Sequence, residues 1–149
     1  MYSHLLVPID GSPLSGHALA QALQLASSVG ARITVLTVIE PFQVMAYEPE
    51  QIASTRDAYE RYARQEADRR LADAAAQATA AGVTHEVLAV SANDPHEAII
   101  DTAHARGCDL VAMASHGRRG IKALVLGSVT AKVLTHSDIP VLVYRPPGN

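Results

Sequence analysis

The sequence has 149 residues, of which 48% are hydrophobic, and a formal net charge of −3. A chain of this size can bury a substantial core, and we expect one domain over residues 1–149. The mild acidity argues against nucleic acid as a partner, because surfaces that bind duplexes are basic. Cys108 is the only cysteine, which excludes a disulfide framework and a cysteine-based zinc site.

The beginning of the chain does not read as a targeting segment. The first apolar run, residues 5–9, is too short for the core of a signal peptide and has no basic segment before it. No later apolar run reaches the length that spans a membrane. We therefore expect a cytoplasmic protein with no membrane partner.

The first elements form a strand, a helix and a second strand. The first strand covers residues 4–9. The helix after it has Ser12 as N-cap and Pro13 as its first residue, and it ends at Gly30. Residues 32–39 are β-branched and apolar, as expected of a strand that is covered on both faces.

A long amphipathic helix is predicted next, after an irregular connection over residues 41–49. It covers about residues 50–81 and ends at Gly82. One stripe of this helix carries its larger apolar residues and small alanines, which are Ile52, Tyr59, Tyr62, Leu71, Ala75 and Ala78. Its charged residues are best interpreted as a solvated face.

The second half of the chain continues the alternation. A third strand covers residues 84–90 and leads to a capping box, with Asp94 as N-cap and Glu97 three residues later. That helix directs Ala98, Ile99 and Ala103 inward and ends at Gly107. The remaining predicted elements are a strand over 109–114, a short helix over 129–134, a strand over 139–144 and a frayed tail over 146–149.

Five apolar strands that alternate with helices indicate an α/β fold, with an open five-stranded parallel sheet and helices on both faces. Right-handed crossovers and a common winding give the strand order 3-2-1-4-5. In that order the chain reverses direction between strands one and four, where ligands bind at the carboxyl ends. The loops that meet there are residues 10–12 and 114–117.

The connection between the fourth strand and the short helix is rich in glycine. Gly117 and Gly127 enclose nine residues, and each lets the backbone approach a ligand closely. Ser128 and Thr130 place hydroxyls beside the free amides of the first helical turn, where anions bind. The pattern therefore predicts a phosphate site, although Gly-Ser before an apolar run is also typical of an ordinary N-cap.

Other residues near these loops also have two interpretations. Asp10 could contact a ligand, or it could cap the first helix or form an Asx-turn with Ser12. His116 could equally be a solvent-facing loop residue. The basic cluster that follows could screen phosphates or simply be solvated; its members are Arg118, Arg119 and Lys122.

The loop also carries a family resemblance. Ala114-x-x-Gly117, nine residues and then Gly127-Ser128 resembles the nucleotide-binding signature of the universal stress protein family, Gly-x-x-Gly-x9-Gly-Ser/Thr. The sequence departs from that signature at its first position, where Ala114 replaces glycine. Segments 7–12, 93–95, 115–120 and 140–143 resemble the family in the same order along the chain.

The resemblance implies an ATP-binding, stress-responsive or regulatory protein that acts as a homodimer, with Mg²⁺ accompanying the nucleotide. It places Pro8 and Asp10 beside adenosine, and the backbone of Val38 beside adenine. The positions that match the ribose and phosphate loop are Met113, Ala114, His116 and Gly117. Those that match the holder of the distal phosphates are Gly127, Ser128, Val129 and Thr130.

The motifs of several enzyme classes are missing from the sequence. There is no P-loop, no Gly-x-Ser-x-Gly nucleophile elbow and no Gly-x-Gly-x-x-Gly fingerprint after the first strand. A candidate base such as Asp10 or His116 has no visible nucleophile partner. We therefore expect slow ATP hydrolysis at most. The alternative function is a dimeric interaction module of the same fold that binds no nucleotide.

The fifth predicted strand suggests how a dimer forms. It lies at the edge of the sheet and has no charge before Arg145, so its unpaired backbone groups invite another strand. Two copies could pair antiparallel through Val141, Leu142 and Val143. The alternative is that the tail at Pro146 and Pro147 folds back over this edge.

Overall fold

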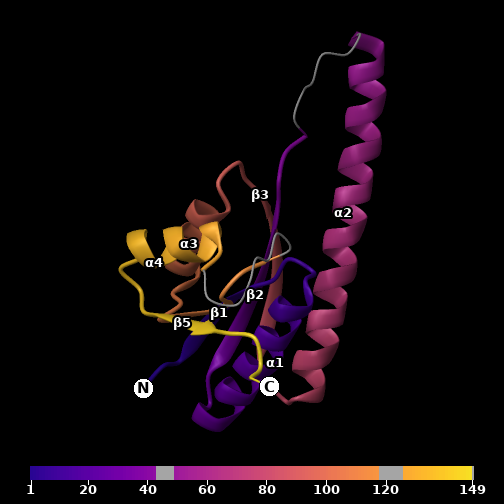
Figure 1. Cartoon of the computed structure of the whole chain (residues 1–149). Coiled ribbons are helices and arrows are strands. Elements are labelled where there is room, and N and C mark those ends of the chain that lie inside the picture. Colours follow the sequence, from indigo (N-terminus) through magenta and orange to yellow (C-terminus); the bar gives the residue numbers. More distant parts are fainter. Residues whose placement is uncertain (43–48, 118–125, 149) are drawn as a thin grey trace.

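The computed structural model describes residues 1–42, 49–117 and 126–148. Within these residues the chain alternates strands and helices (Figure 1). Their order and bounds are β1 (His4–Pro8), α1 (Pro13–Val29), β2 (Arg32–Ile39), α2 (Pro49–Ala80), β3 (His85–Ser91), α3 (Pro95–Arg106), β4 (Leu110–Ala114), α4 (Ser128–His136) and β5 (Val141–Tyr144).

The described strands form one parallel sheet in the order β3-β2-β1-β4-β5. This confirms the predicted fold class and strand order. Consecutive residues of the central strand β1 point to opposite faces, and its apolar residues Leu5, Leu6 and Val7 are all fully buried. Leu5 and Val7 pack in the core that contains Leu71 of α2, whereas Leu6 packs in the core that contains Val133 of α4.

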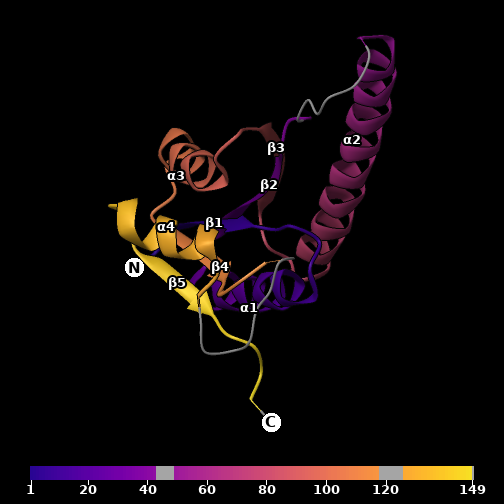
Figure 2. The same cartoon turned by 45° about the horizontal axis from the view of Figure 1, so that its top comes forward.

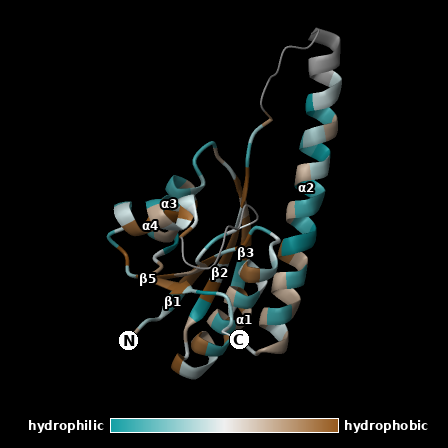
Figure 3. Ribbon diagram, in the orientation of Figure 1, coloured by the Kyte–Doolittle hydropathy of each residue, from teal (hydrophilic) through white to brown (hydrophobic). Residues whose placement is uncertain are grey.

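Two pairs of helices cover the two faces. α1 and α2 lie on one side of the sheet, and α3 and α4 lie on the other, as Figure 2 shows. The strands between them are the most hydrophobic part of the molecule, and much of α2 is hydrophilic (Figure 3). A sheet covered on both faces explains why the strands read as nearly continuous apolar runs.

The predicted ends of α1 are confirmed. The Ser12 side chain accepts a hydrogen bond from the Ser15 amide at 3.2 Å, and Pro13 is the first helical residue. Gly30 ends the helix with φ +72°, a left-handed conformation that favours glycine.

Only the C-terminal half of α2 packs on the sheet, and its N-terminal half extends past the carboxyl ends of the strands (Figures 1 and 2). The buried residues are Ala67, Leu71, Ala74 and Ala78. Tyr62 was expected in the buried stripe, but it is 63% exposed because none of the described strands lies beneath that part of the helix. The side chain of Ile52, and residues 43–48 of the predicted connection, lie outside the described residues.

α2 is long, but it is not apolar along its length. It contains 32 residues, but in the described parts of the chain neither it nor any other helix combines the length and apolar character needed to cross a membrane.

The starts of α3 and α4 differ in detail from the sequence prediction. Asp94 is the N-cap of α3, but its side chain makes no capping hydrogen bond. Its backbone carbonyl instead accepts from the Glu97 amide at 3.1 Å. α4 begins at Ser128, with Gly127 as N-cap, one residue before the predicted start.

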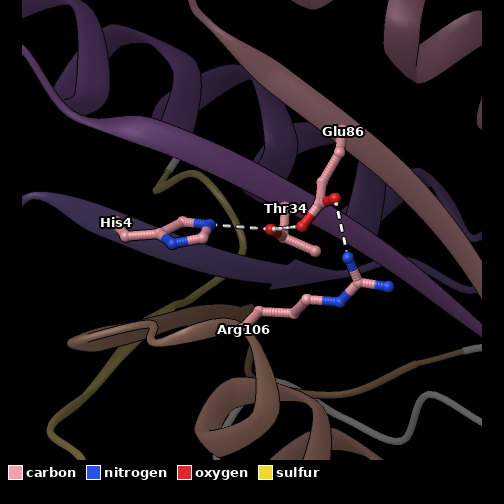
Figure 4. Close-up of polar contacts among 4 residues, drawn as sticks. All are labelled: His4, Thr34, Glu86 and Arg106. Carbon is pink, nitrogen blue, oxygen red and sulfur yellow. Dashed lines mark hydrogen bonds and ion pairs between the residues drawn. The ribbon is translucent and has the colours of Figure 1, made fainter.

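A polar network links side chains at the end of the sheet where the strands begin, opposite to their carboxyl ends (Figure 4). Nε2 of His4 lies 2.7 Å from Oγ1 of Thr34, and the Thr34 hydroxyl donates to Glu86 at 2.8 Å. Arg106 at the end of α3 donates to the other carboxylate oxygen of Glu86 at 3.0 Å. Burial is the main cause that lowers the pKa of His4, and the charge of Arg32 acts in the same direction. The network joins three strands and one helix.

Candidate functional site

A cavity of about 1060 Å³ opens at the carboxyl ends of the strands. The ends of β1, β2 and β4 form its floor, and α2, α3 and α4 contribute to its sides. It includes the position between the neighbouring strands β1 and β4, where the direction of winding reverses. Open α/β sheets bind ligands at such a position.

The structure brings every site residue named from the sequence to this one cavity. Eleven residues from four separate segments line it, namely Pro8, Asp10, Val38, Met113, Ala114, His116, Gly117, Gly127, Ser128, Val129 and Thr130. These segments are brought together because β1 and β4 are neighbours in the sheet.

The loop after β1 lies directly against the loop after β4. A Cβ on Gly117 would collide with Oδ2 of Asp10, so glycine at this position allows the carboxylate to lie where it does. Oδ1 of Asp10 accepts a hydrogen bond from the Ser12 amide at 2.9 Å, which is the Asx-turn considered from the sequence. The turn holds the carboxylate of Asp10 at the floor of the cavity.

Gly127 closes the base of the glycine-rich loop. Its amide donates to the Ser115 carbonyl at 2.8 Å, so both ends of the loop are held together. A Cβ on Gly127 would lie only 3.0 Å from Cα of His116. The contact is with backbone, which cannot move aside as the end of a flexible side chain can. The position therefore strongly favours glycine.

The two hydroxyls at the start of α4 have different environments. Ser128 is exposed at the mouth of the cavity, and its hydroxyl is accessible to a ligand. Thr130 is only 2% exposed, and its hydroxyl donates to the Ala114 carbonyl at 2.9 Å. Thr130 thus fixes the first turn of α4 to the end of β4.

His116 is half-buried, and its Nδ1 lies 3.3 Å from Oγ of Ser115.

α2 contributes a side of the cavity that the sequence reading did not predict. Tyr59, Tyr62, Ala63, Glu66 and Arg70 all line the cavity. Their spacing of three or four residues places them on one helical face, and this is the signal that could have identified them. They were interpreted as core or solvated residues because the sequence does not reveal where the sheet ends beneath the helix.

Lys132 lines the cavity one turn after Ser128 on α4. The basic residues Arg118, Arg119 and Lys122 lie outside the described residues. The described residues contain no cluster of three His, Cys, Asp or Glu side chains that could hold a metal ion.

Comparison with known proteins gives one consistent result. The sequence model of the universal stress protein family matches residues 1–145. Universal stress protein YxiE of Bacillus subtilis is 32% identical over 152 residues, which cover 97% of this chain and 100% of that protein.

Solved structures agree with the sequence comparison. The structure of MJ0577 superposes with a TM-score of 0.83 at 26% identity and covers 100% of this chain and 99% of its own; MJ0577 is a universal stress protein of Methanocaldococcus jannaschii. A universal stress protein solved in complex with cAMP superposes with a TM-score of 0.70 at 26% identity, covering 96% of this chain and 97% of its own.

Proposed function

The chain belongs to the universal stress protein family, and we propose that it is a stress-responsive regulatory protein that binds ATP with Mg²⁺ and acts as a homodimer. One observation carries the nucleotide proposal: the eleven residues named from the family resemblance, which come from four separate segments of the chain, line a single cavity at the switch point of the sheet. The solved relative in complex with cAMP supports an adenine nucleotide as the ligand.

The geometry suggests a role for each part of the site. The carboxylate of Asp10 can accept hydrogen bonds from ribose hydroxyls, and the backbone of Val38 can meet the edge of adenine. The N-terminus of α4 presents free amides and the Ser128 hydroxyl, and both its donors and its helix dipole favour a phosphate. At positions 117 and 127, glycine places no side chain in the cavity that would block the ligand.

The role that we propose for Mg²⁺ is limited to charge neutralisation. Mg²⁺ in nucleotide sites is commonly held by phosphate oxygens and water with only one or two carboxylates. Because Asp10 is assigned to the ribose, phosphate oxygens and water would supply most of the ligands of Mg²⁺ here. We propose nucleotide binding and signalling of the nucleotide state as the main activity. Hydrolysis is slow at most, and it would need only a positioned water at the bound triphosphate.

The homodimer is proposed to form through the outer edge of β5. This strand pairs with β4 on one side, and no described strand pairs with its other side. Leu142 is 36% exposed, and Val141 and Val143 are half-buried. Antiparallel pairing of two copies would satisfy the free backbone groups and cover these apolar side chains.

A thermal unfolding experiment tests the nucleotide proposal. The protein is first shown by mass spectrometry to carry no co-purified nucleotide and is then heated with and without ATP and Mg²⁺. A ligand at a hundred times its dissociation constant adds about 2.7 kcal/mol of stability, which corresponds to roughly 6–10 °C for a chain of this size. An unchanged melting temperature at millimolar ATP would contradict the proposal and favour the interaction module without nucleotide.

A further inference from the structure

One whole side of the cavity is formed by the overhanging half of α2. The five α2 residues that line the cavity share one face of the helix, whereas the buried residues of its C-terminal half lie on an adjoining face. We call these five residues, Tyr59, Tyr62, Ala63, Glu66 and Arg70, the α2 wall. The family signature does not include any of them.

The α2 wall is held in place at the end of β2. The Tyr59 hydroxyl donates to the Glu40 carbonyl at 2.7 Å. The ring of Tyr59 also packs against that of Phe42, with 5.6 Å between the ring centroids, and the guanidinium of Arg56 lies 6.0 Å from the centroid of Phe42. These contacts join the wall to the strand that ends beside the proposed adenine position at Val38. Tyr59 is therefore used to position the wall.

Tyr62 differs from Tyr59 in having no such structural role. It lines the cavity and is 63% exposed. Among the residues that the structure describes, Tyr62 has neither a hydrogen bond nor a ring partner. A large aromatic ring left uncovered beside a cavity offers a surface on which a flat ligand group can stack.

The charges around the cavity indicate which half of a nucleotide lies on this side. Glu66 of the α2 wall, which also pairs with Arg69, and Asp10 at the floor beside it carry negative charge that disfavours a polyphosphate. Arg70 is the cation of the α2 wall. Its guanidinium lies next to Gly11, and its side chain already interacts with another part of the protein.

The opposite side of the cavity is better suited to phosphate. It has the N-terminus of α4 and Lys132 one turn later, and both attract anions. Asp94 lies on the α3 side, so the cationic character is local to α4. With the phosphates at α4, the nucleoside half of the ligand is left to the α2 side.

From this arrangement we propose that Tyr62 stacks on the nucleoside half of the bound nucleotide, so that α2 recognises the base and ribose while α4 recognises the phosphates. The inference rests on the proposed nucleotide binding and adds a specificity-determining residue to it. It also gives the overhang of α2 a function, because a shorter helix would leave the nucleoside uncovered.

Isothermal titration with adenosine and with ATP tests the proposal in three variants. Tyr62→Ala removes the ring and should raise both dissociation constants by the same factor, about tenfold, as expected for one base stacked on an aromatic side chain. Tyr62→Phe keeps the ring and should bind like the wild type. Arg61→Ala changes the neighbouring exposed residue, which does not line the cavity, and should also bind like the wild type.

The outcomes separate this inference from the function on which it rests. An equal loss for adenosine and ATP in Tyr62→Ala alone, with an unchanged circular dichroism spectrum, supports it. Unchanged adenosine binding in Tyr62→Ala, while the wild type binds ATP, overturns the role of Tyr62 and leaves the proposed function standing. A loss for ATP alone would place the phosphates at α2 and also overturn it. A wild type that binds neither ligand overturns the proposed function and this inference together.

Discussion

Asp10 and Gly117 are separated by most of the chain, yet the carboxylate of Asp10 occupies the space that a Cβ at residue 117 would need. The contact makes this position of the Asp10 carboxylate depend on glycine at residue 117. It also makes the orientation of the carboxylate depend on a residue in another loop.

Substitution of Gly117 by alanine is therefore expected to displace the Asp10 side chain. If Asp10 binds ribose, Gly117→Ala should weaken adenosine and ATP by similar factors, because both ligands carry the ribose. Isothermal titration measures both affinities. The control is Asp10→Asn, whose side-chain oxygen can still accept from the Ser12 amide and so preserves the Asx-turn. Unchanged adenosine binding in Gly117→Ala would show that Asp10 does not contact the ribose.

The two hydroxyls of α4 are expected to respond differently to substitution. Ser128→Ala removes an exposed hydroxyl and should weaken ATP more than adenosine, with little effect on unfolding. Thr130→Val removes a buried donor and leaves the Ala114 carbonyl unsatisfied, which should lower the free energy of unfolding by about 1–3 kcal/mol. Titration and urea denaturation of both variants separate the two roles. Equal losses of ATP and adenosine in Ser128→Ala would mean that Ser128 is structural.

The buried position of His4 predicts a dependence of stability on pH. Because burial, with Arg32, lowers the pKa of folded His4 below its ordinary value of 6.5, the unfolded chain binds the proton more tightly. The stability that neutral His4 contributes to the folded state is fully present above the unfolded pKa. It is lost as the pH falls through 6.5 toward the lower pKa of folded His4. Glu86 and Asp109 oppose the shift, and Arg106 also lies in this network.

Urea denaturation between about pH 5 and pH 8 tests the role of His4. The wild type should lose free energy of unfolding on acidification, and His4→Gln should lose less over the same range. His17→Gln, a substitution on α1 outside the network, serves as the control. If His4→Gln and the wild type have the same slope, His4 does not cause the pH dependence.

The register of β5 identifies the substitution that tests the dimer. The carbonyls of Pro140 and Tyr144 accept from amides at the two ends of β4, so these residues face β4. By the alternation of a strand, the Leu142 amide also faces β4 and the Val143 amide points outward. Val143→Pro should therefore give a monomer with an intact sheet, whereas Leu142→Pro should break the pairing with β4 and destabilise the fold.

Light scattering and circular dichroism measure these two effects. A wild type that is monomeric at micromolar concentration would rule out the proposed interface. So would a Val143→Pro variant that remains a dimer.

Much of the fold could be predicted because its signals are local. Ser12 and Pro13 at the start of α1, and Gly30 at its end, act through backbone geometry that any sequence context preserves. The loops at Asp10 and Gly117 could also be placed together once the strand order was inferred, since that order makes β1 and β4 neighbours. Val38 and Met113, in contrast, were named as site residues only through the family resemblance.

The remaining features depend on contacts between distant parts of the chain. The burial of the Thr130 hydroxyl requires the Ala114 carbonyl, sixteen residues earlier and on another element. The exposure of Tyr62 depends on where the strands end beneath α2. The spacing of residues along a helix shows which of them share a face, but it does not show what lies opposite that face, so neither relationship follows from the spacing alone.

Binding of ATP in the cavity at the switch point is tested most directly by titrating ATP into the nucleotide-free wild type and into Gly127→Val. A valine at 127 places side-chain atoms against the His116 backbone and across the proposed phosphate position, whereas residue 127 belongs to neither hydrophobic core. We predict saturable binding of one ATP per chain in the wild type and none in Gly127→Val, with matching circular dichroism spectra. No binding to the wild type, or equal binding to both proteins, would contradict the account.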